Sequence, residues 1–440
     1  MKTDRRNFIK VAGLAGTGII ATGIKGINPG QGKRKRDPFA QTKKISEAEH
    51  EQLFNMCGYS APPLETVCVG FIGLGNRGPV NVDAMAYLEG VEIKALCDKR
   101  MARIDYTQKI LARHGMPPAV AYGGSENAWM DLCKNPDIDL ISIAVPRGPL
   151  HAKIAVCAME NGKHVACEVP IARTIDEAWQ LVETSENTRK HCMMLENCCY
   201  DFFELLTLNM ARQGMFGEIV HGEGAYIHNL VDMNFRKPDD SRQADDAYTD
   251  MWRLKENVRN GNLYPTHGLG PICQIMDINR GDKMEFLVAV MSKDFQMNAM
   301  AKNLAAKDNF YQQFVDNPYR GNMTTTTVLT NKGRTIMIQH DVTSPNVYSR
   351  IHKVSGTKAS ALKYPEPSKI AIGHERWVSD EEMKVIEEKF TPPIIKKIGE
   401  LAKKVGGHGG MDFLENWRLI DCLRNGLPLD QDVYDAALWS

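Results

Sequence analysis

Residues 66–197 alternate between short apolar runs and longer amphipathic segments. The first apolar run, Thr66–Ile72, is followed by glycines and a helical stretch that ends at about Leu88. Further strands are predicted at Val91–Cys97, Ile138–Val145, His164–Glu168 and Cys192–Leu195, with helices at Met101–His114, His151–Asn161 and Ile175–Asn187. Strands that alternate with helices of this length predict a parallel sheet with helices on both faces.

The pattern changes after residue 197. A helix is predicted at about Phe202–Gln213, and the runs beyond it are rich in β-branched residues and lack helical crossovers. These runs are Ile219–His228, Phe286–Met291, Thr324–Thr330, Thr335–His340 and Ser349–Val354. Asn331-Lys332-Gly333 predicts a hairpin turn, and Asp412–Arg424 predicts an amphipathic helix capped by Asn425-Gly426. Residues 198–440 are therefore expected to form an α+β domain on an open, mostly antiparallel sheet.

A glycine-rich motif joins the first predicted strand to its helix. It reads Gly73-Leu74-Gly75-Asn76-Arg77-Gly78, and Asp98 ends the second strand 20 residues beyond Gly78. Such glycines allow a tight turn and the close approach of a pyrophosphate to a helix N-terminus, while the carboxylate accepts hydrogen bonds from ribose hydroxyls. In this context the motif predicts an α/β protein whose residues 66–197 form a Rossmann domain that binds NAD, rather than a purely structural turn. Lys99 or Arg100 could contact a 2′-phosphate, so NADP remains an alternative cofactor.

Composition is that of a globular protein, with 43% hydrophobic and 25% charged residues, which excludes a disordered or fibrous chain. The formal net charge of zero conceals two unlike parts, because residues 1–44 carry +9 and the remainder carries −9. The acidic body argues against nucleic acid as a partner. Eleven cysteines, an odd number without a C-x-x-C pair, indicate neither a disulfide framework nor a zinc site, and no metal is expected.

The basic N-terminus has the features of an export signal. Arg5-Arg6-Asn7-Phe8-Ile9-Lys10 precedes Val11–Ile24, an apolar stretch that is too short and too rich in glycine for a stable membrane span. The pattern resembles a twin-arginine signal over residues 1–30, followed by a linker over residues 31–65 with a short helix near Glu47–Met56. It predicts export by the twin-arginine machinery to the periplasm; the alternative is a solvated basic tail.

A Rossmann domain followed by an open-sheet domain resembles the Gfo/Idh/MocA oxidoreductase family. Ordinary members carry Glu-Lys-Pro at the end of the fifth strand, where the lysine assists alcohol oxidation, whereas this chain has Glu168-Val169-Pro170. Several stretches together resemble glycoside hydrolase family 109, whose NAD-dependent members are typified by α-N-acetylgalactosaminidase activity. They are Glu168-Val169-Pro170, Leu195-Glu196-Asn197, Trp252-Arg253, Asn262–Pro271, Tyr348-Ser349-Arg350 and Gly409–Phe413.

The resemblance implies two groups of site residues. The NAD site would contain Gly73, Gly75, Asn76, Arg77, Gly78, Asp98, Gly148, His151, Glu168, Val169 and Asn197. The sugar site would contain Tyr226, Arg253, Tyr264, Pro265, Thr266, His267 and Tyr348. The loop at residues 146–151 departs from the family, which commonly has a tryptophan before the equivalent of His151, and this departure puts the substrate preference in question.

The resemblance also implies an unusual hydrolytic route. The sugar's C3 hydroxyl is transiently oxidised, the aglycone is eliminated, water adds to the enone and hydride return restores the sugar. His267 and Tyr264 would assist proton transfer at C3, and Tyr226 would be the base at C2. From the residues alone, His267 fits a helix cap and Tyr226 a packed strand residue, while His228 on the same face is an alternative to Tyr226 as the base. Trp252 fits either sugar stacking or the core.

Three functions remain open from the sequence: an exported family 109 glycosidase acting on a carbohydrate, an NAD(P)-dependent sugar or polyol dehydrogenase, and a catalytically silent sugar-binding protein. Val169 in place of lysine argues against the second, and the presence of Tyr264 and His267 argues against the third. By analogy with the family, the open sheet implies a homo-oligomer.

Overall fold

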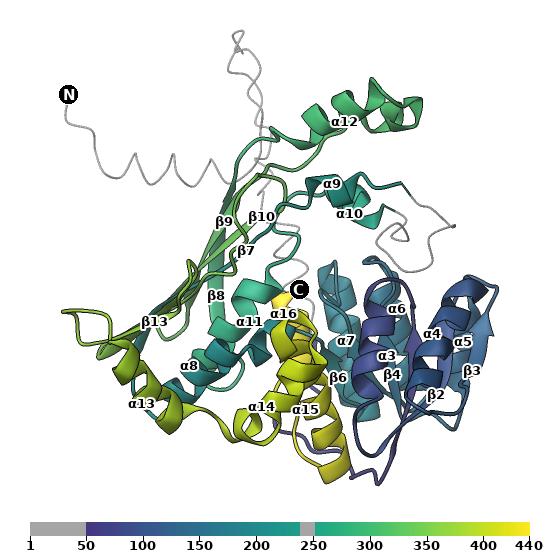
Figure 1. Cartoon of the computed structure of the whole chain (residues 1–440), viewed down its shortest axis with the longest axis horizontal. Coiled ribbons are helices and arrows are strands. Elements are labelled where there is room, and N and C mark those ends of the chain that lie inside the picture. The colour runs from purple at the N-terminus through teal and green to yellow at the C-terminus, as the bar shows by residue number, and fades with distance from the viewer. Residues whose placement is uncertain (1–49, 238–250) are drawn as a thin grey trace, which may run out of the picture.

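The structure is a computed structural model that describes residues 50–237 and 251–440 (Figure 1). The predicted export signal and the first part of the predicted linker lie outside the described residues. Within the described part of the helix predicted at Glu47–Met56, residues 50–56 are not helical. The backbone N–H groups of Leu53 and Phe54 donate to the carboxylate of Glu186 instead of to carbonyls of a helical turn. That prediction was therefore wrong.

Six parallel strands form the N-terminal sheet in the order β3-β2-β1-β4-β5-β6, which is the order of a Rossmann domain. The strands are β1 (Val67–Ile72), β2 (Val91–Asp98), β3 (Val120–Gly123), β4 (Leu140–Ile143), β5 (His164–Cys167) and β6 (Cys192–Met194). The connecting helices are α3 (Arg77–Met85), α4 (Met101–Arg113), α5 (Ala128–Lys134), α6 (Leu150–Glu160) and α7 (Ile175–Thr188). The predicted domain type is confirmed, with the short edge strand β3 added to it.

The C-terminal sheet has seven strands in the order β13-β12-β11-β7-β10-β9-β8. They are β7 (Ile219–Ile227), β8 (Met284–Met291), β9 (Thr324–Thr330), β10 (Thr335–Asp341), β11 (His352–Gly356), β12 (Ala359–Lys363) and β13 (Lys369–Ile372). Only β7 and β10 pair in parallel, so the mostly antiparallel prediction is confirmed. Residues 331–333 form the predicted β9–β10 turn, with Gly333 at a φ of 78°. β11 begins at His352 rather than Ser349, which makes only an isolated bridge to Ile227.

Helix α11 (Thr266–Ile275) packs closely on β7. A Cβ atom on Gly224 would lie 2.0 Å from the carbonyl oxygen of Gly268, and one on Gly268 would lie 2.4 Å from the backbone nitrogen of Ala225. The helix and the strand can therefore approach this closely only because both positions are glycine. The contact places His267, next to Gly268, against Tyr226 of β7.

The C-terminal helices return to the Rossmann domain (Figure 1). Helix α15 (Met411–Asn425) packs on α3 and ends at Gly426 with a φ of 59°, as its capping sequence predicted, while α16 (Val433–Trp439) packs on α7 and β6. The other elements are η1 (Asn197–Tyr200), α8 (Phe202–Arg212), α9 (Val231–Asn234), α10 (Trp252–Glu256), α12 (Met297–Ala305), η3 (Asn309–Phe314), α13 (Asp380–Phe390), α14 (Pro393–Val405) and η4 (His408–Gly410). The C-terminal helices of the second domain thus pack against the Rossmann domain.

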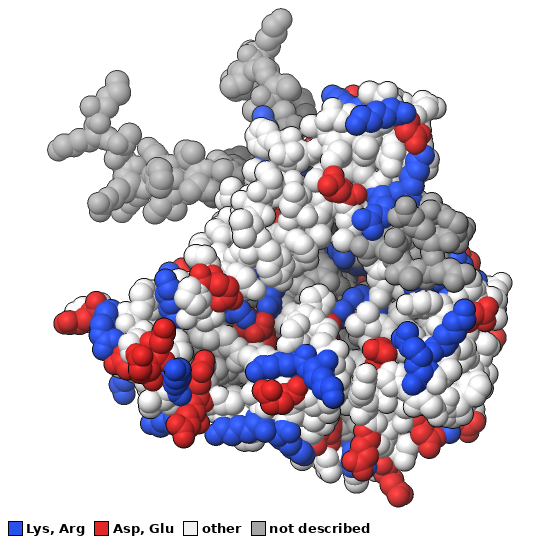
Figure 2. Space-filling model, viewed as in Figure 1, with Lys and Arg blue, Asp and Glu red and all other residues white. Residues whose placement is uncertain are grey.

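Charged side chains of both signs are interspersed over the face of the molecule in Figure 2. Among the residues that the structure describes, none of the helices is both long and apolar enough to cross a bilayer.

Candidate active site

A cavity of about 410 Å³ lies where the carboxyl ends of the Rossmann strands face β7 and α11. At the Rossmann end, its lining includes the predicted residues Gly73, Gly75, Asn76, Arg77, Asp98, His151, Glu168, Val169 and Asn197. At the opposite end, its lining includes Tyr226, Trp252, Arg253, Tyr264 and His267, and His408 also lines the cavity. One cavity therefore brings most residues of both predicted groups together. Gly78, Gly148, Pro265, Thr266 and Tyr348 do not line it.

The glycine turn has the shape that a dinucleotide requires. Gly73 has a φ of 91°, and a Cβ atom there would lie 2.6 Å from the carbonyl carbon of Ala144. Gly78 lies behind the turn, where a Cβ atom would come within 2.0 Å of the carbonyl oxygen of Gly73. Both positions therefore require glycine, and the turn lines the cavity at the N-terminus of α3, which fits a pyrophosphate group.

Asp98 completes the cofactor end of the cavity. Its carboxylate accepts hydrogen bonds from the backbone N–H groups of Leu74 (2.8 Å) and Arg100 (3.0 Å), and its side chain lines the cavity. These two bonds hold the carboxylate beside the turn, at the end of β2, where it can accept hydrogen bonds from ribose hydroxyls. The residues present therefore fit NAD.

Asp412 connects this end of the cavity to α15. Its carboxylate accepts hydrogen bonds from Arg77 Nη1 (2.9 Å) and Asn197 Nδ2 (2.5 Å) and lies 2.9 Å from His408 Nδ1. Burial alone would raise the pKa of Asp412, but His408 and Arg77 hold it below its usual range. Arg77 Nε also donates to Glu168 Oε1 (3.2 Å). The stretch around Asp412 was part of the family resemblance, yet its carboxylate had been assigned no role.

Three rings form the opposite end of the cavity. The ring centroid of Tyr226 lies 5.2 Å from that of Tyr264 and 5.0 Å from that of His267, and the Tyr264 and His267 centroids are 4.7 Å apart. Burial raises the pKa of both tyrosines above its usual value, so both are neutral phenols near pH 7. These phenols can donate hydrogen bonds to a sugar but cannot act unaided as phenolates.

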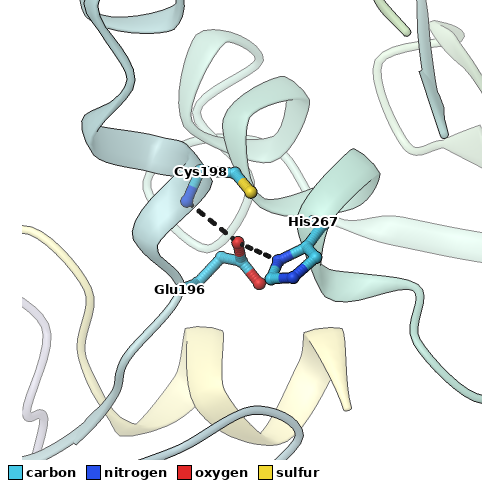
Figure 3. Close-up of side chains that lie close together, drawn as sticks. All are labelled: Glu196, Cys198 and His267. Atoms are coloured by element: carbon cyan, nitrogen blue, oxygen red, sulfur yellow. Dashed lines mark hydrogen bonds and ion pairs between the residues drawn. The ribbon is translucent and has the colours of Figure 1, made fainter. Parts of the chain in front are cut away.

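Glu196 does not line the cavity but contacts His267, which does (Figure 3). Its Oε1 lies 2.7 Å from Nδ1 of His267 and also accepts the backbone N–H of Cys198 at 3.1 Å. Although burial raises the pKa of Glu196, the neighbouring His267 and these hydrogen bonds lower it overall, so the carboxylate is charged. Glu196 was not among the residues predicted for the site. Its position after β6, at the carboxyl edge of a parallel sheet, was the available signal.

The side chains of Glu196, Cys198 and His267 also bring three potential metal-ligand atoms within 4.8 Å of one another. However, the oxygen and nitrogen atoms are at hydrogen-bonding distance, and burial raises the pKa of the Cys198 thiol well above its usual value. A protonated thiol is a poor metal ligand, because the thiolate is the form that binds. The geometry is that of a carboxylate–imidazole pair.

Comparison with known proteins gives the same assignment as the motifs. Residues 200–440 match the C-terminal domain of glycosyl hydrolase 109, and residues 67–196 match the NAD-binding Rossmann fold of an oxidoreductase family. A glycosyl hydrolase family 109 protein of Porphyromonas gingivalis is 48% identical over 394 residues, which cover 86% of this chain and 80% of that protein. The chain belongs to glycosyl hydrolase family 109.

Another family 109 protein, from Shewanella pealeana, is 41% identical and covers 100% of this chain and 92% of its own length. Among solved structures, a levoglucosan dehydrogenase in complex with NADH has a TM-score of 0.61 at 18% identity, covering 85% of this chain and 94% of that one. At this identity the likeness supports the fold alone. The family confirms a glycosidase with an NAD-binding Rossmann domain.

In this family 109 chain, His228 is the partner of Tyr226. Its Nδ1 lies 3.1 Å from the Tyr226 hydroxyl, although β7 ends at Ile227, one residue before His228. Burial lowers the pKa of His228, which is therefore a neutral acceptor near pH 7. The ring of Tyr348, outside the cavity, lies 5.0 Å from that of His228. Tyr348 therefore contacts the site through His228.

The remaining predicted residues support the cavity from its walls. His151 is buried, with Nδ1 and Nε2 each 2.9 Å from a backbone carbonyl, those of Pro170 and Val145 respectively. Gly148 is buried within the preceding loop, and Pro265 and Thr266 form the start of α11. The guanidinium of Arg253 lies 4.4 Å from the ring centroid of Trp252, and both residues line the cavity.

Proposed function

We propose that this family 109 glycosidase releases terminal sugars from glycans through transient oxidation at C3, elimination of the aglycone, addition of water and re-reduction. The distribution of carboxylates along the cavity carries the proposal. Among the described lining residues, the acidic side chains are Asp98, Glu126 and Glu168, and all three belong to the Rossmann domain.

Direct hydrolysis normally uses two carboxylates on opposite sides of the scissile bond. The sugar end of the described cavity instead presents phenols, an imidazole and guanidinium groups. Glu168 is committed to Arg77 and Asn81, and Glu196 is committed to His267. These groups suit proton transfer to and from hydroxyl and C–H groups rather than displacement at C1.

His267 is suited to act as the base at the C3 hydroxyl. When its Nδ1–H donates to the charged Glu196, the lone pair of Nε2 is available to accept a proton. NAD⁺, when bound, supplies the reversible acceptance of a hydride from C3. Tyr264, as a neutral phenol next to His267, donates a hydrogen bond to the same oxygen. His267 and Tyr264 therefore have complementary roles at C3.

Tyr226 is the candidate base at C2. Its raised pKa rules out a standing phenolate, but its hydroxyl contacts the neutral His228, which can take the phenolic proton as the phenol takes the C2 proton. Elimination across the C1–C2 bond of the 3-keto sugar then releases the aglycone from C1. Arg253 binds sugar oxygens at this end of the cavity.

Aryl glycosides test this function, with α-N-acetylgalactosaminides as the first candidates because they typify the family. Purified protein loaded with NAD⁺ should release nitrophenol repeatedly without accumulating NADH, because no net oxidation occurs. Stoichiometric formation of NADH would instead identify a sugar or polyol dehydrogenase. Absence of both products across a broad panel would favour a sugar-binding protein.

Export by the twin-arginine route to the periplasm is also proposed, from the sequence of residues 5–24. This route carries folded proteins, which suits a chain that binds a cytoplasmic cofactor and whose eleven cysteines are all free. Replacement of Arg5 and Arg6 by lysine should leave the protein in the cytoplasm of an expressing cell. Unchanged fractionation into the periplasm would contradict the proposal.

A homo-oligomer is proposed on the basis of β8, the edge strand of the second sheet. Its side chains Phe286, Leu287, Val288 and Val290 are 57–70% exposed, so both faces of the strand present apolar groups to solvent. Exposed apolar edge strands are prone to pair with another chain. Light scattering should give a multiple of the chain mass, and Val288→Lys should reduce it; a wild-type monomer would contradict the proposal.

A further inference from the structure

Arg147 occupies an unusual position in the cavity wall. It follows β4, in the loop before α6 that departs from the family pattern, and is only 9% exposed. Its Nη1 donates a hydrogen bond to the backbone carbonyl of Leu263, the residue that precedes Tyr264. The guanidinium therefore lies at the sugar end of the cavity, although it comes from the Rossmann domain.

Within residues 50–237 and 251–440, the charge of Arg147 has no counter-ion. Among the residues that the structure describes, no carboxylate forms an ion pair with it, and its buried Nε has no hydrogen-bond partner. The nearby carboxylate of Glu256 is already shared by Arg173 (3.0 Å) and Arg259 (3.2 Å). Burial consequently lowers the pKa of Arg147 to about 10. An unpaired buried cation is costly, and a bound anion would remove that cost.

Two other arginines increase the positive charge of this region. Arg253 lines the cavity, and its buried Nε also lacks a partner. Arg320 is 2% exposed and donates to neutral acceptors, including Asn257 Oδ1 and His340 Nδ1. Burial lowers the pKa of Arg320, and the charge of Arg147 contributes to that shift. Across the part of the chain that the structure describes, neither Arg253 nor Arg320 forms an ion pair with a carboxylate.

We propose that the glycan substrate carries an anionic substituent, a carboxylate or a sulfate, that binds to Arg147. Guanidinium groups match such oxyanions in geometry and hydration. The pyrophosphate of NAD is not a suitable counter-ion, because its expected place is the glycine turn at the N-terminus of α3, whereas Arg147 contacts the segment that leads to Tyr264. The proposal rests on the proposed function, since it assigns the sugar to this end of the cavity.

Matched ligands test the proposal by calorimetry on NAD-loaded protein, independently of turnover. The pairs are galacturonate against galactose, and N-acetylgalactosamine 6-sulfate against N-acetylgalactosamine. Wild type should bind the acidic member of at least one pair roughly 10- to 100-fold more tightly, the range for hydrogen bonds to a charged group. The pair that shows the preference distinguishes carboxylate from sulfate.

Arg147→Met should abolish the preference, and Arg147→Lys should retain part of it. Arg259→Met is the matched control, because it removes a nearby cation that is paired and does not line the cavity. The preference of this variant for the acidic ligand should differ from that of wild type by less than about twofold. If Arg147→Met weakens the binding of the acidic and the neutral ligand equally, Arg147 only supports the backbone at Leu263. If the variant weakens only the binding of NAD, the cation serves the cofactor. Either result, or a wild type without preference, overturns the proposal.

The corresponding nitrophenyl glycosides separate this proposal from the proposed function. If the acidic ligands bind through Arg147 but no nitrophenol is released, the anion site stands and the glycosidase mechanism fails. If neutral glycosides are cleaved as efficiently as acidic ones, the mechanism stands and the anion site fails.

Discussion

Nδ1 of His267 lies 2.7 Å from Oε1 of Glu196, a carboxylate that is completely buried beneath the cavity. The pair joins the end of the Rossmann sheet to the first turn of α11, and thus one domain to the other. Because the charged carboxylate fixes the proton on Nδ1, the imidazole presents Nε2 as its basic atom. Glu196 is therefore a positioning residue for His267.

Glu196→Gln should lower kcat by roughly 10²-fold, because the amide keeps the shape of the carboxylate but no longer stabilises the imidazolium. KM should change little, and the acidic limb of the pH profile of kcat should move to lower pH, because an imidazole without the neighbouring carboxylate is less basic. His267→Ala should lower kcat at least as far. Steady-state kinetics from about pH 5 to pH 9 check this, and a Gln variant with the wild-type profile would limit Glu196 to a structural role.

Gly268→Ala should displace His267, although residue 268 itself does not line the cavity. The added Cβ atom would lie 2.4 Å from the backbone nitrogen of Ala225, so α11 must move away from β7 and carry His267 with it. We expect a loss of about 1–3 kcal/mol in the free energy of unfolding, together with lower kcat. Gly148→Ala is the control, because its Cβ atom would meet only the carbonyl oxygen of Pro146 at 3.8 Å. Equal stability of the two variants in urea denaturation would contradict the packing argument.

The site was predictable from sequence where its residues lie in local motifs. The glycine turn and Asp98 combine chemistry with a recognisable context, whereas Tyr264 and His267 were predicted through the family resemblance. Glu196 and Asp412 acquire their roles from partners 71 and 215 residues away, His267 and Asn197 respectively, and no local pattern specifies those contacts. For Arg147, the lack of an ion pair within the described part of the chain likewise depends on distant carboxylates that do not reach it.

The secondary structure also divides into segments that the local sequence predicts and segments that it does not. Strands with continuous apolar or β-branched runs were predicted, whereas β3, β12 and β13 were not, because their short sequences include alanine, serine, glycine or lysine and lack such a run. The helix predicted at Glu47–Met56 fails because Glu186, far along the chain, offers better partners to the backbone of Leu53 and Phe54. Contacts with distant parts of the chain determine the conformation of these segments.

Asp98→Asn should reduce the preference for NAD over NADP by roughly tenfold, because the amide keeps an acceptor for Leu74 but no longer repels a 2′-phosphate. Dissociation constants of both dinucleotides, measured by fluorescence titration, check this. The free energy of unfolding serves as the control for loss of the turn. An unchanged ratio would mean that the carboxylate does not read the ribose.

Glu415 should make the protein less stable as the pH rises. Burial, with the charge of Asp412 nearby, raises the pKa of its carboxyl well above the usual range. The unfolded chain loses this proton near pH 4.3, whereas the folded protein keeps it, so stability falls above that pH by up to about 1.4 kcal/mol per unit until the folded pKa is reached. Glu415→Gln should remove this loss. Urea denaturation at about pH 5 and pH 8 compares the two, and equal pH dependence would contradict the assignment.

The most direct test of the redox route is the fate of the C2 proton. Cleavage of an aryl glycoside in D₂O should give a recovered sugar with deuterium at C2, because the base removes that proton before elimination and solvent returns it. Tyr226→Phe should suppress both exchange and aglycone release. Full release of the aglycone with only protium at C2 would mean simple displacement at C1 and would contradict the account.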